Sequence, residues 1–130
     1  MAFLCKPPFR TGHSLLVPRE EVDQWQDLDP ELAAHLMLVA QRLGRALRIG
    51  FEAARVAVFI AGIEIPHAHL HLIPVEARVY RIGFDFVDEE EFRNREDADD
   101  TNPAPSAAEY EEAAEVIRGA LRTLGLEPSP

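Results

Sequence analysis

Three histidines occupy alternate positions near the middle of the chain: His67, His69 and His71. Alanine, leucine and isoleucine fill the positions between and after them, and a proline flanks the segment at each end. Successive side chains of an extended strand point to opposite faces. The spacing therefore predicts a strand over 67–73 with the imidazoles on one face and the aliphatic side chains on the other. Because an imidazole has an ordinary pKa of about 6.5, these rings could bind a metal, carry protons or act as nucleophiles near neutral pH.

Two of the possible interpretations involve no catalysis. Zinc holds a nitrogen ligand at about 2.0–2.1 Å, whereas same-face strand residues lie roughly 6.7 Å apart, and the outer pair roughly 13 Å apart. Two neighbouring histidines could share one ion, completed by His13 or a carboxylate, but His67 and His71 could hardly both join it. Alternatively, the three rings could be hydrogen-bonded structural residues or a solvated polar face of the strand.

The third interpretation is nucleophilic catalysis at phosphorus. A neutral imidazole that attacks phosphorus forms a phosphoramidate intermediate, which divides one difficult displacement into two easier steps. The outer histidines could then donate to phosphoryl oxygens or fix the tautomer of the nucleophile. Because His69 has a histidine on each side, it is the predicted nucleophile.

The segment Pro66-His67-Ala68-His69-Leu70-His71-Leu72-Ile73 resembles the signature of the histidine-triad (HIT) family, in which three histidines alternate with apolar residues. Thr11 to Arg19 is similar to an upstream strand of that family, which carries a fourth functional histidine. The region around His35 falls where the family has its long helix, and His35 itself is interpreted as structural. The resemblance covers roughly residues 2 to 75. It implies an α+β fold with a mainly antiparallel sheet, one long helix packed on the sheet and a C-terminal helix.

The resemblance also implies a function. The protein would be a nucleotide-binding hydrolase or nucleotidyltransferase, acting on the α-phosphate of a nucleoside phosphoramidate or a dinucleoside polyphosphate. His69 would carry a transient nucleotidyl group, His67 and His71 would orient it and contact the phosphate, and His13 would complete the hydrogen-bonded set. A homodimer is expected. No cofactor is required, although magnesium could arrive with a polyphosphate substrate.

Three features depart from the family pattern. About 25–30 residues normally precede the segment that resembles residues 2–4, so we expect a shortened N-terminus that lacks part of the base pocket. Cys5 stands where an acidic residue commonly holds the ribose hydroxyls. Glu64 stands where many members have Ser or Thr; it is expected to bind substrate, to orient a histidine, or to lie in a solvated loop. Two alternatives stay open: a nucleotide-binding or interaction module without turnover, and a small two-histidine metal-binding protein.

The elements that must position these residues lie on both sides of the triad. Gly12 to Val17, which includes His13, predicts a short strand. Asp29 as N-cap and Pro30 in the first turn predict the start of a helix, and Gly50 predicts its end. Apolar residues at spacings of three and four predict one packed stripe on this helix: Leu32, Leu36, Val39, Leu43 and Leu47. A buried strand is predicted over 55–60 and an irregular strand over 79–87.

The C-terminal part divides into a linker and a helix. Asp88 to Asp100 holds eight acidic and two basic residues and runs into a proline-containing stretch. Residues 88–105 are therefore predicted to be a solvated linker after a core domain of residues 1–87. Ser106-x-x-Glu109 is a capping box, so a helix within 106–130 is predicted to pack on the core or on a partner.

Composition limits the class of protein. The length of 130 residues suits one domain, and 13 basic against 23 acidic residues give a net charge of −10. Nucleic acid polymers and anionic membranes would repel such a chain. The single Cys5 excludes an intramolecular disulfide and a cysteine-built zinc site. Without a long apolar run or a signal-peptide pattern, a cytoplasmic protein is expected.

Overall fold

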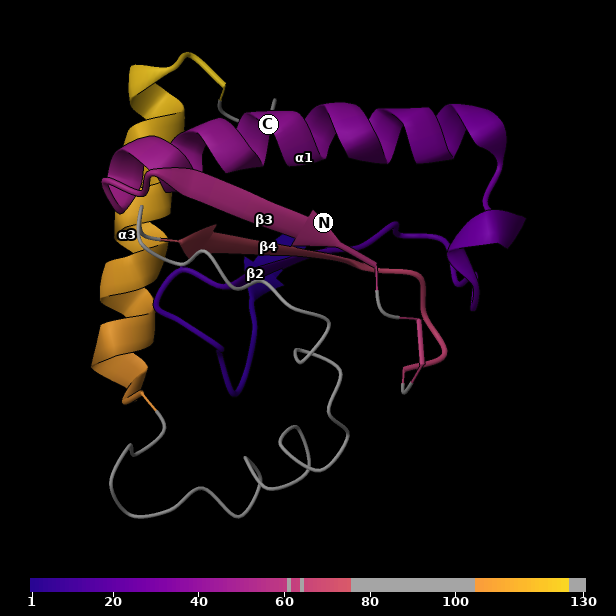
Figure 1. The fold of residues 1–130 in the computed structure, drawn as a ribbon, viewed down its shortest axis with the longest axis horizontal. Helices are drawn as coiled ribbons and strands as arrows, with labels where there is room; N and C mark the ends of the chain where they lie inside the picture. The colour runs from indigo at the N-terminus through magenta and orange to yellow at the C-terminus, as the bar shows by residue number, and fades with distance from the viewer. Residues whose placement is uncertain (61, 64, 76–104, 127–130) are drawn as a thin grey trace.

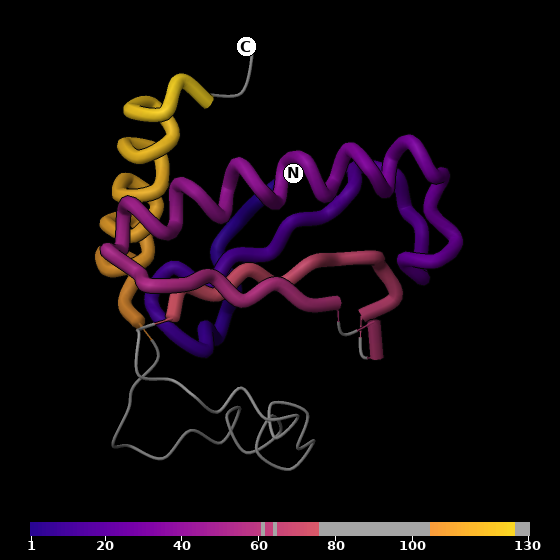
Figure 2. The backbone as a smooth tube through the Cα atoms, turned by 45° about the horizontal axis from the view of Figure 1, so that its top comes forward, coloured from indigo at the N-terminus to yellow at the C-terminus, as the bar shows by residue number. Residues whose placement is uncertain are grey.

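The computed structural model describes residues 1–60, 62–63, 65–75 and 105–126. One antiparallel sheet, with strand order β1-β2-β4-β3, is covered on one face by the long helix α1 (Figure 1). A second helix, α3, crosses the C-terminal end of α1, and both views show the two helices in contact there (Figure 2). The elements are β1 (Ala2–Leu4), β2 (Ser14–Leu16), the 3-10 helix η1 (Trp25–Asp27), α1 (Pro30–Gly50), β3 (Arg55–Phe59), β4 (Leu70–Val75) and α3 (Ala107–Thr123). The predicted α+β fold is confirmed.

The start and the packed face of α1 agree with the sequence. Asp29 accepts hydrogen bonds from the backbone N–H groups of Glu31 and Leu32, at 2.9 and 3.4 Å, and Pro30 needs no acceptor because it has no N–H. The predicted apolar stripe packs against the aliphatic face of the sheet. The buried cluster consists of Leu16, Leu28, Leu36, Ala40, Leu43, Leu47, Ala68, Leu70, Leu72 and Ile117. This core fixes which face of β4 remains for the histidines.

Helix α1 ends at Gly50, as predicted, and Gly50 has a second role as well. The left-handed residue that follows the helix is Glu52, with a φ of 50°, and not the glycine. A Cβ placed on Gly50 would lie 2.7 Å from the Cγ1 atom of Val116 on α3. Gly50 therefore also allows α1 and α3 to cross at close range.

Strand β4 begins at Leu70, three residues later than predicted, so His67 and His69 precede it. It also continues through Pro74, which was expected to end it. β2 pairs with β4 only as far as Leu72, so beyond that point β3 is the single neighbour of β4 among the described strands. A missing N–H is tolerated at such an edge position.

The prediction of a buried strand over 55–60 was wrong about burial. β3 is the last strand in the sheet order, and Val58 keeps 46% of its surface exposed and Ile60 36%. On α1, Met37 and Leu38 are exposed by 55% and 58%. Residues of both elements line an open apolar groove of about 710 Å³: Ala34, Met37, Leu38, Ala40, Gln41, Gly44, Val56 and Val58.

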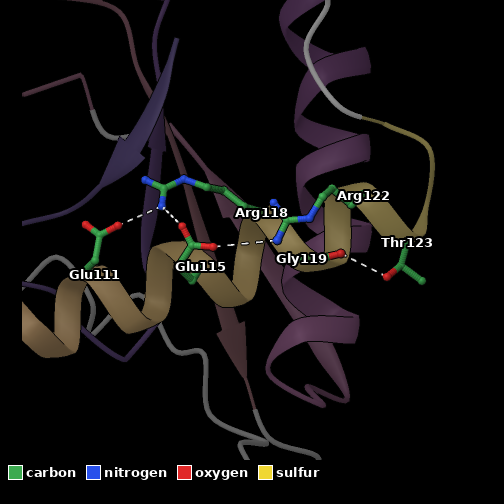
Figure 3. A network of polar contacts seen from close by, with 6 residues as sticks. All are labelled: Glu111, Glu115, Arg118, Gly119, Arg122 and Thr123. Atoms are coloured by element: carbon green, nitrogen blue, oxygen red, sulfur yellow. Dashed lines mark hydrogen bonds and ion pairs between the residues drawn. The ribbon is translucent and has the colours of Figure 1, made fainter.

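Helix α3 is amphipathic and begins at the predicted capping box. The backbone N–H of Glu109 donates to the hydroxyl of Ser106, and the backbone N–H of Ser106 donates to the carboxylate of Glu109. On its solvent side Arg118 pairs with Glu111 and Glu115 (Figure 3). These side chains are at least half exposed, so their ion pairs add little stability. The opposite side of α3 buries Ala113, Ile117 and Ala120.

Two sequence predictions fall outside the described residues. These are the strand over 79–87 and residues 88–104 of the predicted linker. Within the described part of the chain, no helix combines the length and apolar character needed to cross a membrane.

Candidate active site

The histidines lie on the face of the sheet opposite α1. Ala68, Leu70 and Leu72 belong to the core beneath α1, so the alternating residues His69 and His71 point to the other side. Antiparallel pairing of β2 with β4 brings His13, the residue before β2, beside His71. All three rings are nearly covered: His13 has no exposed surface, His69 6% and His71 7%.

The rings form one contiguous array. The centroids of His13 and His71 are 5.2 Å apart, and those of His69 and His71 are 4.8 Å apart with the rings edge to face. Phe9 stacks on His13 at 5.2 Å, and Phe59 stacks on His71 at 4.5 Å with only 5° between the ring planes. Two aromatic side chains therefore flank the histidine pair from both ends.

Hydrogen bonds assign the tautomer of His13 and of His71. The backbone N–H of Phe9 donates to Nδ1 of His13 at 3.2 Å, so the single proton of a neutral His13 ring lies on Nε2. That N–H donates to Nδ1 of His71 at 3.0 Å. The proton of a neutral His71 must then lie on Nε2, a buried atom with no partner among the described residues. His71 thus offers an oriented, unused hydrogen-bond donor.

His69 has the complementary arrangement. Its Nδ1 lies 2.8 Å from the carbonyl oxygen of His67 and must donate to it, because a carbonyl can only accept. The lone pair of a neutral His69 is therefore on Nε2, which makes no hydrogen bond to any described residue. An imidazole held in this way is a nucleophile whose second nitrogen can carry the positive charge that develops on attack.

Burial also controls the charge of His71. Desolvation, with a smaller contribution from the neighbouring His69, lowers the pKa of His71 to about 4. His71 is therefore neutral over the whole physiological range. It acts as a hydrogen-bond donor and not as a fixed positive charge.

The other residues considered for the site in the sequence analysis do not join this array of rings in the described structure. His67 is directed toward the segment after β2, where its Nε2 donates to the carbonyl oxygen of Pro18 at 3.2 Å. The ring of His67 makes no contact with the other histidine rings within the described residues. Glu64 lies outside the described residues. His35 is exposed on α1, away from the site.

Cys5 follows β1 and begins the loop that leads to His13. Its backbone N–H donates to the carbonyl of His13 at 2.9 Å, and burial raises the pKa of its thiol. The thiol therefore stays protonated near neutral pH. A buried, protonated thiol is typical of a structural cysteine.

Sequence reasoning missed Phe9 and Phe59. The signal for Phe59 was present in the predicted strand over 55–60, because an antiparallel pairing with the histidine strand would place one of its residues opposite a histidine. In the structure Phe59 is directly opposite His71. Phe9 had no comparable signal, because it lies in an irregular loop.

No cluster of three or more metal-ligating side chains is found in the part of the chain that the structure describes. Among the described rings, the imidazole nitrogens recorded closest to each other are Nε2 of His13 and Nδ1 of His71, 3.0 Å apart, and they share a hydrogen bond. A metal ligated by Nδ1 of His71 would have to break this bond.

Comparison with known proteins identifies the family. The HIT domain model matches residues 1–78 of this chain. The protein therefore belongs to the histidine-triad family, as the triad, the long helix and the antiparallel sheet together indicate.

Several curated relatives carry functional names. The chain is 32% identical over 74 residues to the adenosine 5'-monophosphoramidase of Saccharomyces cerevisiae, covering 56% of this chain and 47% of that protein. It is 32% identical over 89 residues to the bifunctional bis(5'-adenosyl)-triphosphatase/adenylylsulfatase of Arabidopsis thaliana, covering 65% of this chain and 46% of that protein. An uncharacterized HIT-like protein of Saccharolobus solfataricus is 26% identical over 96 residues, covering 70% and 69%. The match thus spans about half the length of the two relatives with named activities.

Solved structures agree on the fold. A histidine triad nucleotide-binding protein from Sulfolobus tokodaii has a TM-score of 0.72 at 22% identity and covers 95% of this chain and 78% of its own. A zinc-bound histidine triad family protein from Mycobacterium smegmatis has a TM-score of 0.66 at 26% identity, with coverage of 95% and 78%.

Proposed function

We propose that this protein is a nucleotide hydrolase or nucleotidyltransferase. Its substrate would be a nucleoside phosphoramidate or a dinucleoside polyphosphate, attacked at the α-phosphate through a covalent His69–nucleotide intermediate. The observation that carries the proposal is the 2.8 Å bond from Nδ1 of His69 to the carbonyl of His67, because it leaves the Nε2 lone pair for attack. The named activities of the yeast and plant relatives support this substrate class.

In the first step, Nε2 of His69 forms a bond to the α-phosphorus while the bond from phosphorus to the leaving group breaks. The positive charge that develops on the imidazole is stabilised through its Nδ1–H by the carbonyl of His67. An amine leaving group departs with one proton taken from solvent. The Nε2–H of His71 would donate to a phosphoryl oxygen, which becomes more negative as the new bond forms.

In the second step, water attacks the same phosphorus and the N–P bond breaks. The nucleotide monophosphate leaves, His69 regains its Nε2 lone pair, and one proton returns to solvent. An acceptor other than water would give nucleotidyl transfer. This chain needs no cofactor of its own for either step, and magnesium would be part of a polyphosphate substrate. The net charge of −10 favours small nucleotides over nucleic acid polymers or anionic membranes as partners.

The test is the covalent adduct. The full chain is incubated with an adenosine phosphoramidate, quenched in base because N–P bonds are acid-labile, and analysed by intact-mass spectrometry. Wild type and the control His35→Asn should show one adenylyl group and release of AMP, whereas His69→Asn should show neither. Nucleotide binding without adduct or release in the wild type would identify a binding module instead. Stoichiometric zinc that is lost in His69→Asn would identify a metal protein.

We also propose that the protein forms a homodimer through β3 and the groove beside α1. No described strand pairs with the outer edge of β3, and a second copy of β3 could pair with it in antiparallel fashion around a two-fold axis. The exposed side chains of Leu38 and Val58 would be covered. α1 has no acidic residue between Glu31 and Glu52, so this face avoids the repulsion expected elsewhere on the chain.

A further inference from the structure

Phe59 and His71 form the closest ring contact in the described site. They are directly opposite each other in the β3–β4 pairing, so the backbone hydrogen bonds of the sheet determine their contact. Their centroids are 4.5 Å apart with nearly parallel planes. The Phe59 ring therefore stacks on one face of the imidazole, while His13 holds its Nδ1.

We propose that Phe59 is a positioning residue for the reaction: it holds His71 in the neutral tautomer that directs Nε2–H to the substrate. The proposal rests on the function proposed above, because it assigns the substrate as the partner of that N–H. Phe59 would act through His71 and would not touch the reacting atoms. A flat ring is required, because an aliphatic side chain cannot stack on the face of an imidazole in this way.

The hydrogen-bond chain explains why neutrality matters. A second proton on His71 would have to sit on Nδ1, which faces the Nε2–H of His13 at 3.0 Å. Two donors would then face each other, and the bond that orients His71 would be lost. Nδ1 of His13 cannot take the extra proton instead, because it already accepts a hydrogen bond from the backbone N–H of Phe9.

The groups around His71 do not favour its charged form. Among the described residues, the titratable side chains that face it are His13 from before β2 and His69 from before β4. β2 contributes no charged residue. The charged residue of β3 is Arg55, which is opposite Val75 at the other end of the strand. Covering the ring face from water is therefore the main means of keeping His71 neutral, and Phe59 is the side chain that does so from β3.

The experiment compares five forms of the full chain: wild type, Phe59→Leu, Phe59→Ala, Phe59→Tyr and the control Val58→Ala. Val58 is on the same strand but points to the opposite face of the sheet. The ring signals of His71 are followed by NMR from pH 4 to pH 8, and kcat/KM for an adenosine phosphoramidate is measured over the same range. Phe59→Ala serves as a second, larger truncation, and circular dichroism checks that each variant is folded.

We expect the pKa of His71 to rise from about 4 toward 6.5 in Phe59→Leu and Phe59→Ala. Phe59→Tyr, which keeps the ring, should behave like the wild type. If the pKa reaches 6.5, the neutral fraction at pH 5.5 falls to about one tenth, so kcat/KM should drop about ten-fold there and less than about two-fold at pH 8. KM should change less than kcat, because Phe59 does not touch the substrate.

Two results would overturn the proposal. One is an unchanged His71 pKa in both truncated variants. The other is a pH profile that shifts equally in Val58→Ala, because this would indicate general destabilisation. The NMR titration needs no substrate, so it still tests Phe59 if the wild type shows no turnover. Absence of turnover with a shifted pKa would reject the proposed function and keep the role of Phe59 in holding His71 neutral.

Discussion

Nε2 of His13 lies 3.0 Å from Nδ1 of His71, and both atoms are buried. Since the backbone N–H of Phe9 occupies the other nitrogen of His13, this contact has a definite direction from His13 to His71. A backbone group thereby determines, through two imidazoles, which nitrogen of His71 carries its proton.

The first prediction concerns His13. Replacing His13 with Phe removes the donor to Nδ1 of His71 and leaves that nitrogen buried without a partner. This should cost roughly 1–3 kcal/mol of unfolding free energy. His71 could then adopt either tautomer, so kcat for an adenosine phosphoramidate should fall about 10- to 100-fold. Urea denaturation and steady-state kinetics measure the two effects.

The matched control is His35→Phe, which changes an exposed histidine on α1. It should leave both quantities within error of the wild type. Normal turnover in His13→Phe would show that the proton on His71 does not need to be directed.

The second prediction is the pH dependence of stability that follows from His71. Its pKa is lowered from 6.5 to about 4 in the folded protein, so the unfolded chain binds the proton more readily between these values. Above pH 6.5 this group does not lower the unfolding free energy. As the pH falls from 6.5 toward 4, the unfolding free energy decreases. The unfolding free energy of the wild type should drop relative to His71→Gln by roughly 2 kcal/mol between pH 7 and pH 4.5, allowing for solvent screening.

Chemical denaturation at a series of pH values measures this difference. Comparison with His71→Gln removes the contributions of the many carboxylates, because they are common to both proteins. A constant difference between the two proteins across this range would mean that His71 titrates normally when folded.

The third prediction uses two glycines of α1. A methyl group at Gly50 would lie 2.7 Å from Val116, so Gly50→Ala should destabilise the protein by about 1–3 kcal/mol through overpacking. A methyl group at Gly44 meets no atom within 4 Å, so Gly44→Ala should stabilise the helix by up to about 1 kcal/mol. Thermal unfolding of both variants measures the two changes in stability, which should have opposite signs.

The double variant Gly50→Ala with Val116→Ala supplies the control for this contact. It should recover most of the loss, because the clash is with the Val116 side chain. A loss that persists in the double variant would place the constraint in the helix backbone and not in the contact between α1 and α3.

Much of the site could be predicted because it depends on local rules. Alternation along an extended segment separated His69 and His71 from the aliphatic core, although the ladder itself begins only at Leu70. The Asp29-Pro30 start of α1 and the Ser106 capping box of α3 are equally local. Each of these features involves residues within four positions of one another.

The features that were missed depend on contacts between distant segments. The stacking of Phe59 on His71 follows from the register between β3 and β4, which a sequence pattern does not specify. The position of Pro74 inside β4 depends on where β2 stops pairing. The exposure of Val58 was missed because an apolar strand has the same pattern whether it lies inside a sheet or at its end.

The last prediction tests the proposed homodimer. Val58→Glu places a charge on the exposed edge strand and in the groove beside α1, so two copies would bring two carboxylates together without a nearby partner. The wild type should run as a dimer in analytical ultracentrifugation, and Val58→Glu should shift to the monomer while keeping its circular dichroism spectrum. Thr123→Glu, an exposed position on α3 away from the groove, should remain dimeric.

Because the histidine array lies on the opposite face of the sheet from α1, the monomeric variant should still form the His69 adduct. A wild type that is monomeric at micromolar concentration would contradict the proposed dimer.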